Sequence, residues 1–113
     1  MSRPSARTSG PSRAAPLFAA LGDETRLALV DRLGASGPLS IVRLTAGSGV
    51  TRQAITKHLH VLAGAGLVHD VRRGRERIWE LDPVRLDVAR GYLDQIGQQW
   101  DEALERLRLF VED

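Results

Sequence analysis

Hydrogen-bonding side chains share one surface of a helix that the sequence predicts from Thr51 to about Ala65. Three apolar residues at steps of four and three mark its inward face: Ile55, Leu59 and Leu62. The side chains that point away from that face are Arg52, Gln53, Thr56, Lys57 and His60. An arginine can bond to a guanine edge, and a glutamine to an adenine edge, through two hydrogen bonds. The outward surface of this helix therefore has the chemistry to read DNA bases.

The start of the same helix is suited to phosphate. Thr51 is a typical N-cap residue, and the free backbone N–H groups of a helix N-terminus attract anions. The hydroxyls of Thr51 and Thr56 can reach phosphates, and we expect Lys57, the single lysine of the chain, to contact the DNA backbone or a purine. The alternative is an ordinary solvated helix face, which these residue types also fit.

A second cationic group lies in a stretch from Val68 to Leu81, where apolar and polar residues alternate with a period of two. Arg73 and Gly74 stand where a β-hairpin would turn. The arginines near this tip are Arg72, Arg73, Arg75 and Arg77. We expect Arg73 and Arg75 to lie along phosphates or in a minor groove. Arginines at a turn also serve solubility alone, and Glu76 could pair with one of them.

Upstream of these groups the sequence predicts a tail and two helices. Residues 1–13, rich in Ser, Pro and Arg, are expected to be a disordered basic tail, and residues 14–113 to form one domain. A first helix is predicted from Ala14 to Leu21. Asp23 caps a second, which ends near Gly34 to Gly37. The apolar face of that second helix is predicted to be Leu27, Val30 and Leu33.

The order of the remaining elements defines the expected fold class. Ser40 caps a short helix that ends at Gly47, and a glycine-containing turn joins it to the longer Thr51 helix. Two helices joined in this way are the helix-turn-helix pattern. With the hairpin after it, the chain is predicted to be a mostly helical α+β protein, a winged helix-turn-helix with a β-hairpin wing and a long terminal helix.

The terminal helix is predicted to start with Asp82 as its cap and Pro83 at its first position. Its apolar stripe is about 28 residues long, or roughly 40 Å of helix, which exceeds what a small domain can cover. A second copy of the chain is the expected partner, with an interface formed by Leu17, Phe18, Leu93, Ile96, Trp100, Leu104 and Leu107. Trp79 and Tyr92 lie on apolar faces and are expected in the core or the dimer interface.

Composition narrows the class of protein. The chain has 113 residues and a net charge of +2, but residues 1–79 carry 12 basic and 5 acidic side chains, which suggests that this part meets a polyanion. There is no cysteine, so disulfides, thiolate metal sites and cysteine nucleophiles are excluded. No nucleophile–base pair or G-x-S-x-G motif suggests an enzyme. Without an export signal or a membrane-length apolar run, we expect a soluble, cytoplasmic protein with no membrane partner.

Three stretches of the sequence resemble the ArsR/SmtB family of bacterial transcriptional repressors. They are LGDETRLALVDRL (21–33), VTRQAITKHLHVLAGAGLV (50–68) and GRERIWELDP (74–83). The resemblance covers about residues 14–110. It implies a homodimer that binds double-stranded operator DNA and blocks transcription. The recognition helices of such a dimer lie one DNA turn apart, roughly 34 Å, so the operator is expected to be an imperfect palindrome.

The resemblance also bears on how the protein is regulated. Metal sites of the family use cysteine pairs on the helix before the recognition helix, or His and carboxylate clusters on the last helix. The first place here reads Leu44-Thr45-Ala46-Gly47, and the last helix has carboxylates but no histidine, so we expect neither a metal nor a cofactor. The runs WELDPVRL and QQWDEALERL are similar to a branch without metal ligands, often encoded beside START-like proteins.

Two questions stay open at the level of sequence. Family repressors commonly bind upstream of their own gene, so autoregulation is expected. The resemblance also allows a small-molecule inducer, which the sequence does not identify. The rival interpretation is a winged-helix module that mainly contacts other proteins and has little specific affinity for DNA.

Overall fold

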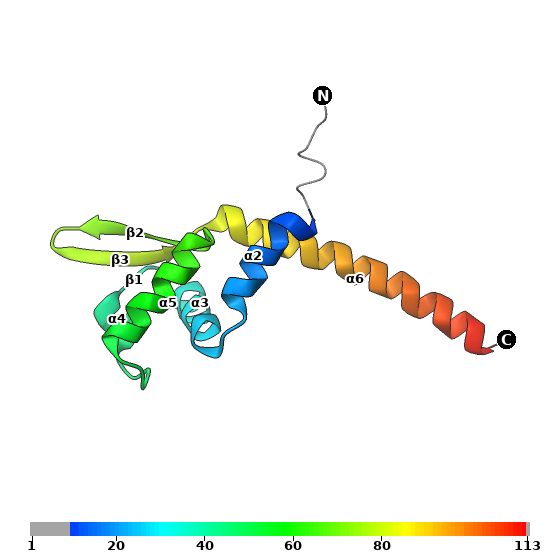
Figure 1. The fold of residues 1–113 in the computed structure, drawn as a ribbon, viewed down its shortest axis with the longest axis horizontal. Coiled ribbons are helices and arrows are strands. Elements are labelled where there is room, and N and C mark those ends of the chain that lie inside the picture. The colour runs from blue at the N-terminus through cyan, green and yellow to red at the C-terminus, as the bar shows by residue number, and fades with distance from the viewer. Residues whose placement is uncertain (1–9, 113) are drawn as a thin grey trace, which may run out of the picture.

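The computed structural model describes residues 10–112, in which five helices and a three-stranded antiparallel sheet follow the predicted order (Figure 1). Along the chain they are α2 (Pro11–Leu21), α3 (Glu24–Ser36), β1 (Leu39–Ser40), α4 (Ile41–Thr45), α5 (Arg52–Gly64), β2 (Val68–Arg73), β3 (Glu76–Leu81) and α6 (Pro83–Glu112). Helices α4 and α5 form the helix-turn-helix, β2 and β3 form the wing, and α6 is the long terminal helix. The predicted fold class is confirmed.

Side-chain caps set the starts of three helices at the residues predicted for them. The carboxylate of Asp23 accepts a hydrogen bond from the backbone N–H of Arg26 at 3.0 Å. The hydroxyl of Ser40 accepts one from Arg43 at 3.3 Å, and that of Thr51 accepts one from Ala54 at 3.1 Å. Each bond satisfies an N–H group that has no partner inside the helix, so the cap fixes where the helix begins.

The first helix begins earlier than predicted. Helix α2 starts at Pro11 and not at Ala14, so residues 11–13 of the expected tail are helical. Gly10 precedes the helix with a φ of 68°, and a proline suits the first helical position because it has no N–H group to leave unpaired. The rest of the expected tail, residues 1–9, lies outside the residues that the structure describes.

The predicted apolar face of α3 is wrong at one position. Leu33 is buried as expected and Val30 packs against the core, but Leu27 is 53% exposed and Leu29 takes its place inside. Each step of three residues falls about 60° short of a full helical turn, so two such steps put Leu27 roughly 120° away from Leu33. The step of four from Leu29 to Leu33 keeps both leucines on the inward face.

The sheet contains one strand that the sequence did not predict. Strand β1 pairs with β3, with Leu39 opposite Trp79 and Ser40 opposite Ile78, and the strand order is β1-β3-β2. A two-residue strand is too short to show an alternating pattern, which is why it escaped prediction. The predicted hairpin is confirmed, with Arg73 opposite Glu76 across the turn.

The core lies where the helix-turn-helix, the first two helices and the wing base meet. The predicted inward residues of α5, Ile55, Leu59 and Leu62, are all fully buried. Leu44 from α4 is also fully buried, and Trp79 from β3 is 3% exposed. Each such side chain stabilises the fold by about 1.5–3 kcal/mol. The burial of α5 against this core holds its polar side at the surface.

Helix α6 leaves the domain after its first turns. Ala89 is buried, and the ring of Tyr92 lies 6.1 Å from that of Phe18 in α2. From residue 97 onward every described residue of α6 is exposed, and Figure 1 shows this half projecting away from the wing. The molecule consequently measures 64 Å along its longest axis. None of the helices within residues 10–112 combines the length and apolarity required to cross a membrane.

Candidate nucleic-acid interface

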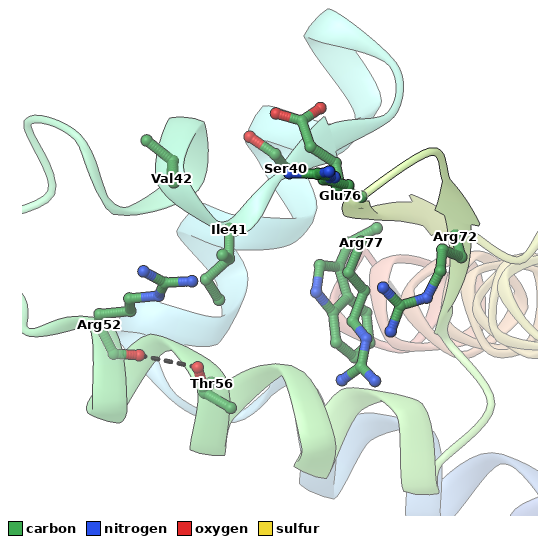
Figure 2. Close-up of a pocket in the computed structure, with 10 residues that line it drawn as sticks. Ser40, Ile41, Val42, Arg52, Thr56, Arg72, Glu76 and Arg77 are labelled. Carbon is green, nitrogen blue, oxygen red and sulfur yellow. Dashed lines mark hydrogen bonds between the residues drawn. The ribbon is translucent and has the colours of Figure 1, made fainter.

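A cleft of about 350 Å³ separates the start of α5 from the wing and from α4. Four arginines line it together with one acidic residue and an apolar floor: Ser40, Ile41, Val42, Arg52, Thr56, Arg72, Arg75, Glu76, Arg77 and Trp79. Figure 2 shows Arg72 and Arg77 extending from the wing toward α5, while Arg52 extends from the start of α5 toward Ile41. The cleft thus combines cationic and apolar side chains, which can contact the phosphates and the apolar sugar surfaces of a nucleic acid.

The register of the hairpin explains why these arginines share a face. Arg72 is directly opposite Arg77, and Asp70 is directly opposite Trp79. Side chains two residues apart on a strand point to the same side, so these four lie on the face that carries Trp79 into the core. Trp79 anchors that face, and the arginines farther along the strands extend it over the cleft.

The charges of the cleft are only partly balanced within the chain. The Nε atom of Arg77 lies 2.9 Å from a carboxylate oxygen of Asp70, in a half-exposed ion pair. Arg72 and Arg77 are directly opposed cations, an arrangement that costs up to about 1 kcal/mol across a sheet. A bound phosphate would relieve this repulsion, because it places negative charge between the two guanidinium groups.

The side chains of α5 that were predicted to contact DNA lie in the cleft or beside it. Arg52 and Thr56 line the cleft, whereas Gln53 and Lys57 are exposed on α5 beside it. His60 is exposed too, with its ring 6.0 Å from that of Trp79. All five stay on the surface of α5, as predicted.

The two predicted threonines already make local hydrogen bonds. The Thr51 hydroxyl accepts from the N–H of Ala54, and the Thr56 hydroxyl donates to the backbone oxygen of Arg52 at 2.9 Å (Figure 2). Thr51 keeps a free hydroxyl hydrogen for a phosphate, since it acts as an acceptor in its cap. Thr56 would have to rotate before it could donate to one, because its hydroxyl is bonded to a backbone oxygen one turn earlier.

Sequence reasoning did not select all residues of the cleft. Of the two arginines expected to contact DNA, Arg75 lines the cleft and Arg73 does not, whereas Arg72 and Arg77 do. The period-two alternation around Gly74, extended into an explicit strand register, could have identified this pair. Ile41 and Val42 were expected only as part of a short helix, and Val42 is nonetheless 60% exposed at the cleft.

A polar cluster holds the recognition helix against the preceding elements. Arg26 donates from Nε to the backbone oxygen of Ala20 at 2.5 Å, and its Nη1 lies 3.2 Å from Nδ1 of His58. The same His58 nitrogen is 3.8 Å from Asp23. The N–H of Arg26 that donates to Asp23 lowers the pKa of this carboxyl group below its usual value. These contacts tie α5 to the junction between α2 and α3.

The residues expected at a dimer interface do not all lie at the surface. Leu17 is 2% exposed and packs in the core of its own chain, so Leu17 is not part of the interface proposed below. Phe18 and Ile96 are half-buried. The other four are more than half exposed along the projecting helix: Leu93, Trp100, Leu104 and Leu107. Over the described residues, no three His, Asp or Glu side chains are grouped so that they could hold a metal ion.

The fold and the arginine-lined cleft together define a winged helix-turn-helix protein. A family model described as a helix-turn-helix domain matches residues 21–71. The HTH-type transcriptional regulator Rv2034 of Mycobacterium tuberculosis (strain ATCC 25618 / H37Rv) is 44% identical over 85 residues, 75% of this chain and 76% of that protein. The HTH-type transcriptional regulator YuzN of Bacillus subtilis (strain 168) is 37% identical over 86 residues, 69% of this chain and 92% of YuzN.

Solved structures agree with these relatives. An ArsR-like transcriptional regulator from Rhodococcus sp. RHA1 has a TM-score of 0.72 and 36% identity, over 88% of this chain and 92% of that one. The homodimeric winged helix-turn-helix DNA-binding domain of Mb0332 from Mycobacterium bovis has a TM-score of 0.65 and 25% identity, over 94% of this chain and 93% of that one. The chain belongs to the ArsR-like family of DNA-binding helix-turn-helix transcriptional regulators.

Proposed function

We propose that the protein is a homodimeric repressor that binds a palindromic operator through α5 and the wing. The observation that carries this proposal is the cleft between these two elements, with Arg52 on one side and Arg72, Arg75 and Arg77 on the other. The side chains of α5 enter the major groove, and the DNA backbone next to it occupies the cleft. The arginine tip of the wing then lies along the neighbouring phosphates or minor groove.

Apolar side chains of α6 support the homodimer. Trp100 is 67% exposed and Leu104 is 63% exposed, at a spacing of four residues on one helix face. Side chains of this size are rarely left in water along several turns unless a partner covers them. The Mb0332 domain, which has the same fold, is homodimeric. In a two-fold dimer the two α5 helices would lie about 34 Å apart and face successive major grooves.

Repression follows from occupancy in this proposal. A dimer bound over a promoter excludes the transcription machinery, and binding upstream of its own gene would make the protein autoregulatory. The protein then acts in the cytoplasm, where the DNA is.

Selection of bound sequences from a random DNA pool tests the proposal directly. The wild-type protein is expected to enrich an imperfect palindrome whose half-sites are one helical turn apart. Failure to retain any DNA at moderate salt would contradict it and favour a winged-helix module that contacts other proteins.

Alanine variants separate sequence reading from backbone binding. Arg52→Ala and Gln53→Ala are expected to lose preference for the selected sequence while the protein remains dimeric. Arg72→Ala and Arg75→Ala are expected to weaken binding to every sequence and to reduce the slope of log affinity against log salt by about one each. Arg73→Ala tests the arginine that lies outside the cleft and should reduce the slope less than Arg75→Ala.

Arg90→Ala is the matched control for these variants. It removes an exposed arginine of α6 that is paired with Asp87, away from the cleft, and should leave affinity and salt dependence unchanged. Equal affinities for the operator in wild type and all cleft variants would overturn the assignment of the cleft to DNA.

A further inference from the structure

His69 sits at the base of the wing, where the hairpin joins α6. The residue lies on β2 directly opposite Glu80 of β3, and its Nε2 is 2.7 Å from a carboxylate oxygen of Glu80. Its other ring nitrogen, Nδ1, is 3.5 Å from a carboxylate oxygen of Asp82, which immediately precedes α6. One imidazole therefore spans two carboxylates that belong to different elements.

Only the charged ring satisfies both carboxylates. A neutral imidazole carries one N–H group, so one of its nitrogens would present a lone pair to a negatively charged oxygen. The imidazolium carries an N–H group on each nitrogen and is attracted by both partners. Glu80, which accepts a hydrogen bond from the ring, is the main cause that raises the pKa of His69 above its usual value, and the negative charge of Asp82 adds to it.

Other charged groups near the base of the wing are directed elsewhere. On β2, Asp70 pairs with Arg77 on the face toward the cleft. On α5, His60 is directed at the indole of Trp79, on that same face. On α6, the side chain of Arg85 folds over Gly66. The carboxylates of Glu80 and Asp82 are thus the groups in ion-pair contact with His69 among the described residues.

Asp82 transmits the contact to α6. One oxygen of its carboxylate faces His69, while the other accepts a hydrogen bond from the backbone N–H of Val84 at 3.0 Å and so caps the helix. The backbone N–H of Asp82 donates to Leu67 at 2.9 Å, next to the start of β2. The ring of His69 thereby joins both strands of the wing to the first turn of α6.

We propose that His69 is a positioning residue, which as an imidazolium holds the wing at a fixed angle to α6 and makes DNA binding weaken as the pH rises. This inference rests on the proposed function, since it assigns DNA contacts to the wing and dimer contacts to α6. The ion pairs set the angle between those two elements. Two wings in a dimer reach their phosphates together only when that angle is maintained in both chains.

The direction of the pH effect follows from the coupling between proton binding and the folded structure. A pKa that is raised in the folded protein means that the pairs contribute fully below the ordinary imidazole value of 6.5. Their contribution is lost as the pH rises through the higher folded-state pKa. The wing is therefore held most firmly below pH 6.5 and is released as the pH rises through the folded-state pKa of His69.

NMR titration of the histidine rings tests, without DNA, whether His69 pairs with Glu80 and Asp82. The His69 midpoint is expected to fall in Glu80→Gln, which removes the main partner, and in Asp82→Asn. Asparagine caps helices as well as aspartate does, so Asp82→Asn removes charge while it preserves the cap of α6. Heteronuclear NOE values of the wing amides are expected to drop above the wild-type midpoint. A His69 midpoint that is identical in wild type and both variants would overturn the proposal.

Operator affinity provides the second measurement. Between about pH 6 and about pH 8.5 the wild type is expected to lose about threefold more affinity than His69→Gln, whose side chain is neutral throughout. His58 and His60 are present in both proteins, so their contributions cancel in this comparison. Parallel pH profiles would show that His69 does not position the wing on DNA. Absence of DNA binding by wild type at every pH would contradict the proposed function as well, and the NMR titration would still decide whether the ion pairs form.

Discussion

Gly66 is the residue at which the recognition helix gives way to the wing. Its φ is 80°, a conformation that side chains rarely adopt, and a Cβ atom built there would lie 2.8 Å from Cγ of Arg85. The backbone N–H of Gly66 also donates to Ala63, in the last turn of α5. The placement of the wing relative to α5 thus depends on a position where any residue other than glycine is strained.

We expect Gly66→Ala to destabilise the protein by about 2 kcal/mol, because alanine is strained in the left-handed conformation and its Cβ atom displaces Arg85. Urea denaturation followed by circular dichroism measures this change. Gly91→Ala is the matched control, since Gly91 lies inside α6 with no atom near its added Cβ. That variant should be stabilised by about 0.5–1 kcal/mol. Equal stability of Gly66→Ala and wild type would show that the turn is not restrictive.

Leu17 shows where residue-level inference from sequence has a limit. Leu17 and Phe18 are neighbours on a short apolar helix, and both were expected to face a second chain. In the structure Leu17 is in the core and Phe18 is half-buried against Tyr92. Adjacent residues of a helix differ in direction by about 100°, so only one of them can share a face with the exposed stripe of α6.

At the scale of elements, caps and inward faces were the most predictable features. The predicted caps at Asp23, Ser40, Thr51 and Asp82 and the buried stripe of α5 depend on residues close together in the sequence, so local patterns contain them. Strand β1 and the true start of α2 were not predicted. Strand β1 exists because it pairs with β3, about 40 residues later in the chain, and no local pattern records that pairing.

Substitution of Thr51 tests whether its cap stabilises helix α5. We expect Thr51→Ala to destabilise the protein by about 1 kcal/mol and to lower operator affinity, because the first turn of the recognition helix frays without its cap. Thr51→Ser retains the hydroxyl and should restore both properties. Urea denaturation and fluorescence anisotropy with labelled operator DNA measure the two effects. Unchanged stability of the alanine variant would contradict the role of the cap.

The shape of the whole molecule separates its two working surfaces. The wing and the C-terminal end of α6 lie at opposite ends of the long axis (Figure 1). Residues 97–112, the described part of the outer half of α6, are all exposed, and several of them are large and apolar, among them Phe110 at 79%. A helix of this kind is stable in water when a partner covers its apolar stripe.

A double variant tests whether α6 pairs two copies. Trp100→Asp with Leu104→Asp places charges in the stripe and is expected to shift the protein to monomers in sedimentation equilibrium. Operator affinity should fall at least about 100-fold, because each monomer then binds a single half-site. Gln98→Asp, on the opposite side of α6 from Trp100, is the matched control and should remain dimeric. A dimer that persists in the double variant would place the interface elsewhere.

The sequence by itself determined the fold class, the caps, the core face of α5 and the residues of its polar surface. These features depend on hydrophobic periodicity and on residue types with strong local preferences, which act over a few residues. The tertiary structure alone decided that the wing face with Arg72 and Arg77 lies across a cleft from α5, that Leu17 lies in the core and that His69 joins the wing to α6. Each of these depends on the register or angle between elements far apart in the chain. Local patterns are compatible with several such arrangements, and the packing of the folded chain determines which one forms.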